Sequence, residues 1–157
     1  MTEISVTYRW MTPDDGVALA RLHRRSILLD AARAYGSAIA HSWMEGMRPA
    51  AFADAAAGGE CIEVAVAHGV VVGFCGVKDN EIKGLYVDPG FTRLGIASGL
   101  MVRAQARIAA AGHDGVRVTA ALSGVPFYAA AGFRKVDARL HDTRGGLRME
   151  VVEMARP

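Results

Sequence analysis

The stretch between residues 85 and 100, LYVDPGFTRLGIASGL, constrains this chain more than any other. It runs from an apolar strand through an Asp-Pro-Gly stop into the start of a helix. The first backbone N–H groups of a helix lack partners within the helix, and the helix dipole is positive at that end. Gly95 and Ala97 would let a bulky anion approach the backbone, while Arg93 and Ser98 offer a charge and a hydroxyl. The residues therefore predict either an anion site or a plain strand–turn–helix connection that needs glycine only for its geometry.

Segments with strand-like and helix-like periodicity surround this stretch. The strand-like segments cover residues 4–11, 61–68, 70–77, 81–87, 115–122, 134–140 and 147–154. The helical segments cover residues 13–28, 36–57, 96–113 and 124–132. The three strands between residues 61 and 87 are joined by very short links, which favours antiparallel hairpins. Because no repeat, linker or low-complexity tract interrupts the chain, we predict one mixed α+β domain over residues 1–157.

The composition narrows the range of partners. Of the 157 residues 52% are apolar, and the formal net charge of +2 is too small and too scattered to favour nucleic acid. The longest uncharged run, residues 118–133, contains Pro126 and is too short to span a membrane. The early Glu3 and the absence of an apolar signal region predict a cytoplasmic protein. Cys61, Cys75 and the five histidines lack the spacing of metal ligands, so we expect no metal.

Two blocks of the sequence resemble one known family. LYVDPGFTRLGIAS resembles the acetyl-CoA loop of the GCN5-related N-acetyltransferase (GNAT) family, in which a strand precedes Gln/Arg-x-x-Gly-x-Gly/Ala and a helix. Thr92 stands where the family usually has Gln or Arg. LSGVPFYAAAGF resembles a later block of the same family, although Ala121 takes the place of an asparagine or small polar residue. The resemblance is specific between residues 60 and 136, and both blocks occur there in the family's order.

This resemblance implies a fold and a cofactor. It implies an α+β, GNAT-like mixed central sheet of about six to seven strands with helices on both faces. It also implies that acetyl-CoA is the acyl donor and that the end of one strand pairs its backbone with the pantetheine arm. The loop that follows would hold the pyrophosphate. The cofactor-binding residues implied in this way are Leu85, Tyr86, Val87, Thr92, Arg93, Leu94, Gly95, Ile96, Ala97 and Ser98.

The resemblance also assigns roles to two titratable side chains. Acetyl transfer to an amine needs a base for the ammonium, a donor for the developing oxyanion and an acid for the leaving thiolate. Tyr128 matches the family's tyrosine beside the cofactor sulfur, whereas the alternative is a packing residue next to Phe127. Glu81 lies fourteen positions before Gly95, as does the base of histone-acetylating members, and partial burial would raise its pKa. Alternatively, Glu81 is only a turn residue and a chain of water molecules acts as the base. The oxyanion donor is expected to be a backbone N–H near Val87.

The acceptor side is expected to come from residues 21–50. Ser26, Tyr35, His41 and Trp43 are the polar and aromatic candidates there, although each type more often serves packing than recognition. The resemblance implies transfer to a primary amine, either a small molecule or a peptide amine. Because no Cys lies in a motif that would favour a covalent intermediate, we expect direct transfer in a ternary complex. The charge and the apolar runs predict neither a nucleic-acid nor a membrane partner. The two C-terminal strand segments are apolar, which suggests a homodimer formed through the sheet.

Two other classes of protein remain open from the sequence. A GNAT-like protein that binds CoA but has lost catalysis could act as a sensor. FYAAAGF also resembles a block of the glyoxalase and bleomycin-resistance proteins. That fold needs two βαβββ copies with His and Glu metal ligands, and the chain shows neither.

Overall fold

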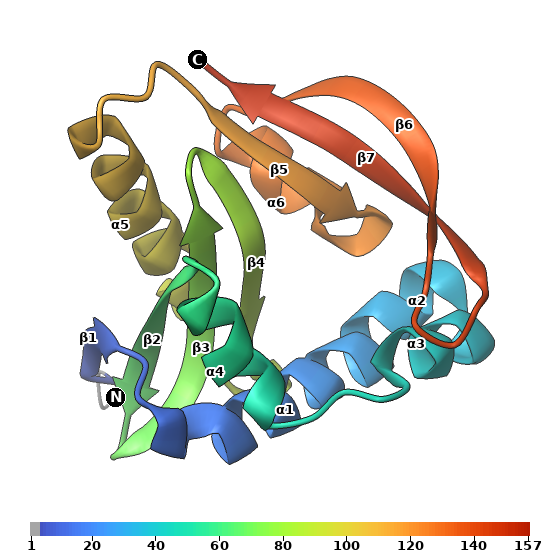
Figure 1. Ribbon diagram of the computed structural model, residues 1–157, viewed down its shortest axis with the longest axis horizontal. Helices are drawn as coiled ribbons and strands as arrows, with labels where there is room; N and C mark the ends of the chain where they lie inside the picture. Colours follow the sequence, from blue (N-terminus) through green and yellow to red (C-terminus); the bar gives the residue numbers. More distant parts are fainter. Residues whose placement is uncertain (1–3) are drawn as a thin grey trace.

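A seven-stranded mixed sheet forms the framework of the protein (Figure 1). The computed structural model describes residues 4–157. In spatial order the strands are β1 (Val6–Trp10), β2 (Cys61–Ala67), β3 (Val70–Lys78), β4 (Glu81–Val87), β5 (Val116–Ala121), β7 (Arg148–Arg156) and β6 (Arg134–Asp142). Every neighbouring pair is antiparallel except β4 and β5, which are parallel. The predicted α+β class and the predicted hairpins between residues 61 and 87 are confirmed.

Helices cover both faces of the sheet, as expected. One face carries α1 (Gly16–Ser26), α2 (Ala32–Tyr35), α3 (Ser37–Met44) and α4 (Ala50–Ala57). The other face carries α5 (Ile96–Ala110) and α6 (Val125–Ala130). Four short turns of helix join these elements, namely η1 (Pro13–Asp15), η2 (Ile27–Ala31), η3 (Pro89–Phe91) and η4 (Leu122–Gly124). Within residues 4–157, no helix has the length and apolar character needed to cross a membrane.

Helix α5 is fixed against the sheet by apolar packing and by an ion-pair network. Leu100, Ala104 and Ile108, spaced four residues apart, are buried in the main core as the helical period predicts. On the polar side, Arg103 and Arg107 of α5 reach the buried carboxylate of Glu63 on β2, at 2.8 and 2.7 Å. Burial raises the pKa of Glu63, but the two arginines outweigh this effect and hold the pKa below its usual value. The buried apolar residues and the ion pairs therefore fix α5 against the sheet.

Strands β4 and β5 pair over only two positions and then diverge. The paired residues are Glu81 with Arg117 and Ile82 with Val118. A β-bulge in β4 follows at once, because Val77 pairs with Ile82 whereas Gly76 pairs with Gly84. Figure 1 shows the resulting gap between the two strands, with α1–α3 on its open side. From residue 83 to 87, the edge of β4 that faces β5 has no strand partner among the described residues.

The two C-terminal strands differ in burial. Strand β7 is central to its part of the sheet, and Met149, Val151, Val152 and Met154 are buried there. Strand β6 lies at the edge and is exposed along its whole length. The sequence suggested two apolar strands, but only β7 contributes to the core.

Candidate active site

The loop between β4 and α5 has the backbone geometry of an anion site. Arg93 and Gly95 both have left-handed backbone conformations, with φ angles of 63° and 81°. Alternation between left-handed and right-handed residues turns successive N–H groups toward one point, and the N-terminus of α5 adds its own free N–H groups. Residues 92–95 are exposed, whereas Ile96 is buried in the core and anchors the helix. A Cβ built on Gly95 would meet no protein atom within 4 Å, so the space above the loop is open.

Side chains around the loop maintain its shape. The Asp88 carboxylate accepts a hydrogen bond from the Gly90 N–H at 2.9 Å and pairs with Arg25 of α1 at 3.1 Å. The Thr92 hydroxyl donates to the Pro89 carbonyl at 3.3 Å. The threonine that departs from the family pattern therefore stabilises the turn with its hydroxyl, and its backbone N–H stays in the exposed loop.

Two cavities meet where β4 and β5 diverge. The larger has a volume of about 400 Å³ and the smaller about 170 Å³. Both are lined by the same five residues of the two strands, namely Lys83, Gly84, Tyr86, Thr119 and Ala121. The free edge of β4 lies at this junction, so its backbone groups are available to an extended ligand.

The smaller cavity contains the predicted acid. Tyr128 lines it together with Ser26 and Leu85. The Tyr128 ring is buried and packs edge-on against Phe127 and Phe133, with centroid distances of 5.4 and 5.5 Å. Burial raises the pKa of the Tyr128 phenol well above its usual value. The hydroxyl is therefore protonated at neutral pH and can donate a proton or a hydrogen bond into this cavity.

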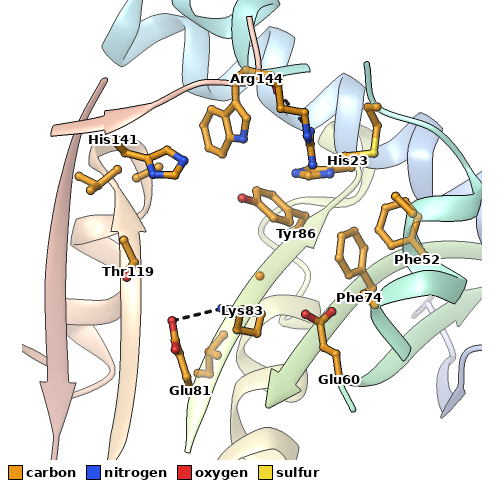
Figure 2. Close-up of a pocket in the computed structure, with 18 of the residues that line it drawn as sticks. His23, Phe52, Glu60, Phe74, Glu81, Lys83, Tyr86, Thr119, His141 and Arg144 are labelled. Carbon is orange, nitrogen blue, oxygen red and sulfur yellow. Dashed lines mark hydrogen bonds and ion pairs between the residues drawn. The ribbon is translucent and has the colours of Figure 1, made fainter. Parts of the chain in front are cut away.

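The larger cavity contains the predicted base. Glu81 lies on its wall and forms ion pairs with Lys83 at 3.7 Å and with Arg117 at 3.6 Å. Figure 2 shows Glu81 at one end of the cavity, with its carboxylate directed toward Lys83. The proposed acid and the proposed base thus lie in two different cavities that share the strand junction.

The acceptor candidates from residues 21–50 separate into different positions. Trp43 lines the larger cavity and Ser26 lines the smaller one. Tyr35 lines neither, and its hydroxyl donates to the Glu150 carbonyl and accepts from the Leu122 N–H at 2.7 Å. His41 is exposed and bonds to Ser37 within α3. In this geometry Tyr35 ties α2 to β7 and η4, a role that the sequence did not predict.

Sequence reasoning missed a second carboxylate in the larger cavity. Glu60, just before β2, lies over Gly76, where an added Cβ would collide with its carboxylate. Burial raises the pKa of Glu60, although Lys83 and Lys78 act in the opposite direction. Figure 2 shows Glu60 and Glu81 at the same end of the cavity. No motif marks Glu60 in the sequence, because its position depends on the glycine on the neighbouring strand.

A buried histidine was also missed. His23 of α1 is 8% exposed, and neither ring nitrogen has a hydrogen-bond partner among the described residues. The ring packs against Tyr86 at 4.2 Å and edge-on against Phe74 at 5.8 Å. Burial, with a smaller contribution from the charge of Arg144, lowers the pKa of His23 to about 3. The imidazole is therefore neutral at physiological pH and lies in the wall of the larger cavity.

Comparison with known protein families identifies the family to which this fold belongs. The chain belongs to the GNAT acetyltransferase family, because residues 31–152 match the family model described as an acetyltransferase (GNAT) domain. No curated protein sequence matches the chain. The glyoxalase-type alternative is excluded, since that fold needs paired βαβββ units and the chain forms one GNAT-like sheet.

Solved structures with the same fold cover almost the whole chain. A GCN5-related N-acetyltransferase from Rhodopseudomonas palustris is 23% identical with a TM-score of 0.91, over 99% of this chain and 98% of that one. The PaiA N-acetyltransferase from Thermoplasma acidophilum, solved with coenzyme A, is 22% identical with a TM-score of 0.76, over 97% and 98% of the two chains. YncA from Salmonella typhimurium, a putative acetyltransferase solved with acetyl-CoA, is 16% identical with a TM-score of 0.72, over 96% and 92%.

Proposed function

We propose that the protein is an N-acetyltransferase that moves the acetyl group of acetyl-CoA to a primary amine by direct transfer in a ternary complex. The observation that carries this proposal is the junction of two cavities at the split between β4 and β5, with an anion loop beside it. One cavity can hold the thioester arm while the other holds the amine. Neither reactant then needs to leave before the other binds.

The smaller cavity and the loop suit the cofactor. The open edge of β4 at Leu85, Tyr86 and Val87 offers backbone groups to the amides of the pantetheine arm. The loop from Thr92 to Ser98 offers N–H groups to the pyrophosphate. The solved complexes of PaiA with coenzyme A and of YncA with acetyl-CoA support this choice of donor.

The reaction needs a base for the ammonium and an acid for the thiolate, which we assign to the two cavities. Glu81 takes the proton that the acceptor ammonium must lose, and the free amine nitrogen then attacks the thioester carbonyl carbon. As the C–N bond forms and the C–S bond breaks, Tyr128 gives its proton to the leaving thiolate, and the second proton that the nitrogen loses on becoming an amide restores the Tyr128 phenol. A backbone N–H of the free β4 edge stabilises the oxyanion, and residues near Gly84 lie closer to the cavity junction than Val87 does.

Glu60 is a second candidate for the base, because it shares the larger cavity and burial raises its pKa. A carboxylate must be ionised to act as a base, and a raised pKa brings the proton affinity of the Glu60 carboxylate closer to that of the acceptor amine. Trp43 is assigned to the acceptor wall and Ser26 to the cofactor side, while Tyr35 positions α2. Both cavities are formed within one chain, so the proposed chemistry does not depend on a homodimer. The cytoplasmic location expected from the sequence completes this proposal.

Thiol release tests the proposal most directly. The purified protein would be mixed with acetyl-CoA and a library of amines, and free CoA thiol would be measured together with the acetylated product. Amine-dependent thiol release in a 1:1 ratio with product is the expected result. CoA binding by calorimetry without turnover on any amine would favour the catalytically silent sensor, and absence of CoA binding would contradict both.

A further inference from the structure

Arg144 is held over the larger cavity by a well-anchored hairpin. The tip between β6 and β7 docks on α3, where the Thr143 hydroxyl bonds to Ser42 and the Gly145 N–H donates to the Ser42 carbonyl at 2.9 Å. A Cβ on Gly145 would collide with Ser42, so this contact depends on glycine. The Arg144 guanidinium donates to the Trp43 carbonyl at 3.3 Å. The docked hairpin therefore holds the backbone of Arg144 at the cavity lip, where its exposed side chain lines the cavity.

The charge of Arg144 is not matched by an acidic side chain. The other basic residues of the cavity wall are engaged, since Lys83 pairs with Glu81 and Arg139 pairs with Glu153 at 2.8 Å. Within residues 4–157, Arg144 forms no ion pair. Among the described residues the guanidinium has one hydrogen bond, to the Trp43 carbonyl, so its other N–H groups are suited to a carboxylate or a similar planar anion.

His23 supplies an independent observation at the same end of the cavity. Its ring is more than nine-tenths buried, lines the cavity and lacks a partner at either nitrogen. Buried polar groups are normally hydrogen-bonded, so an unpartnered imidazole in a cavity wall points to a ligand. Figure 2 shows His23 and Arg144 close together, across the cavity from Glu60 and Glu81. Neutral His23 can donate one N–H to an anion without adding charge.

The cavity is thus polar at both ends and apolar between them. The acidic end lies near the strand junction and the cationic end lies under the hairpin. The apolar wall between them consists of Trp43, Met47, Ala51, Phe52, Ala55 and Phe74. A volume of about 400 Å³ suits a small molecule rather than a folded surface.

We propose that the acceptor is a small, apolar amine that carries a carboxylate, with the amine toward Glu81 and the carboxylate bound by Arg144 and His23. An ω-amino acid, in which an apolar chain separates the amine from the carboxylate, has this arrangement of groups. The inference rests on the proposed N-acetyltransferase function and adds the substrate class to it. Arg144 and His23 act here as specificity-determining residues that hold the acceptor and take no part in the proton transfers.

Matched pairs of amines test this inference. 6-Aminohexanoate would be compared with pentylamine, and 8-aminooctanoate with heptylamine, so that each pair differs only by the carboxylate. Wild-type kcat/KM should favour the carboxylated member of each pair. In Arg144→Met, loss of a charged hydrogen-bond donor should lower kcat/KM for that member by roughly 10- to 100-fold, mainly through KM. For the decarboxylated member the change should stay within about twofold, as for a surface substitution.

Arg148→Met is the control, because Arg148 belongs to the same hairpin but is 73% exposed at its side chain and does not line the cavity. It should leave the preference unchanged, and His23→Phe should weaken it. Equal loss for both members of a pair, or no preference in the wild type, would overturn the inference and leave the acetyltransferase proposal intact. Calorimetry of the same amines with the CoA-bound protein separates the two proposals. Arg144-dependent binding of the carboxylated amines without turnover would support the inference while contradicting the proposed function.

Discussion

The proposed cofactor side and the proposed acceptor side of this site are built in different ways. The cofactor side consists mainly of backbone groups from one continuous segment, residues 85–98, in which a strand, a turn and a helix N-terminus follow one another. The acceptor side consists of side chains from α1, α3, α4, β3, β4, β5 and the β6–β7 hairpin. A backbone site therefore depends on local geometry, whereas a side-chain site depends on how distant elements pack together.

This comparison predicts that the cofactor side is most sensitive to a change in backbone geometry. Gly95→Val places a side chain in the space open to the pyrophosphate, at a φ of 81°. We expect CoA affinity to fall by roughly 100-fold, since several charge-assisted hydrogen bonds are lost together. Calorimetric titration with CoA measures the effect.

Gly112→Val is the matched control for this prediction. Gly112 follows α5 at its other end, has a φ of 92° and also has no protein atom near an added Cβ. Both variants should lose stability through the strained backbone, but only Gly95→Val should lose CoA affinity. Similar CoA affinities in the two variants would show that the loop does not bind the pyrophosphate.

Removing one hydroxyl from Tyr128 or from Tyr35 tests whether each tyrosine acts in catalysis or in stability. Tyr128→Phe removes the proposed acid from the smaller cavity and should lower kcat by about 100-fold while acetyl-CoA affinity changes little. Tyr35→Phe removes a hydroxyl that joins two backbone groups and should instead cost about 1–3 kcal/mol of unfolding free energy. Steady-state kinetics and chemical denaturation of both variants provide the measurements. A larger effect of Tyr35→Phe than of Tyr128→Phe on kcat would reverse the assignments.

The sequence was informative wherever function depends on contiguous residues. The α+β class, the hairpins, the period of α5 and the exposed loop around Gly95 all follow from local pattern and turn chemistry. By contrast, Glu60 depends on the space left by Gly76 on the neighbouring strand. Arg144 depends on a hairpin docked on α3, and His23 on aromatic rings from three other elements. Such contacts join residues far apart in the chain, so no local signal could have marked them.

The pH dependence of kcat/KM should show which of the two carboxylates, Glu81 or Glu60, acts as the base. A base is active only when ionised, so kcat/KM should rise with pH through the pKa of the group that acts. Glu81→Gln should lower kcat/KM by about tenfold, less than Tyr128→Phe, because Glu60 or water remains near the amine. Profiles of the wild type, Glu81→Gln and Glu60→Gln with one amine would show which carboxylate carries the acidic limb.

An acidic limb that disappears only in Glu60→Gln would transfer the role of base to Glu60. That limb should lie above the ordinary glutamate pKa of 4.5, because burial raises the pKa of Glu60. A limb that persists unchanged in both variants would instead belong to the substrate amine. In that case the two glutamates would contribute negative charge to the acceptor cavity but would not accept the proton.

The smallest effect at neutral pH is expected for His23, which should make the unfolding free energy depend on pH. The pKa of His23 is about 3 in the folded protein, whereas the ordinary histidine pKa of 6.5 applies to the unfolded chain. Between these two pH values the unfolded chain therefore binds more protons than the folded protein does. Unfolding free energy should therefore decrease as pH falls below about 6.5. His23 alone should account for a loss of about 2 kcal/mol of unfolding free energy between pH 7 and pH 5.

His23→Phe keeps an aromatic ring beside Tyr86 and should remove this loss, as urea unfolding at the two pH values would show. Arg144→Met should reduce the loss only slightly, because burial is the larger cause and the arginine charge the smaller one. If the wild type and His23→Phe lost equal stability on acidification, His23 would take up its proton equally in the folded protein and in the unfolded chain, and the imidazole would not be the buried, unpartnered group on which the cationic end of the cavity depends.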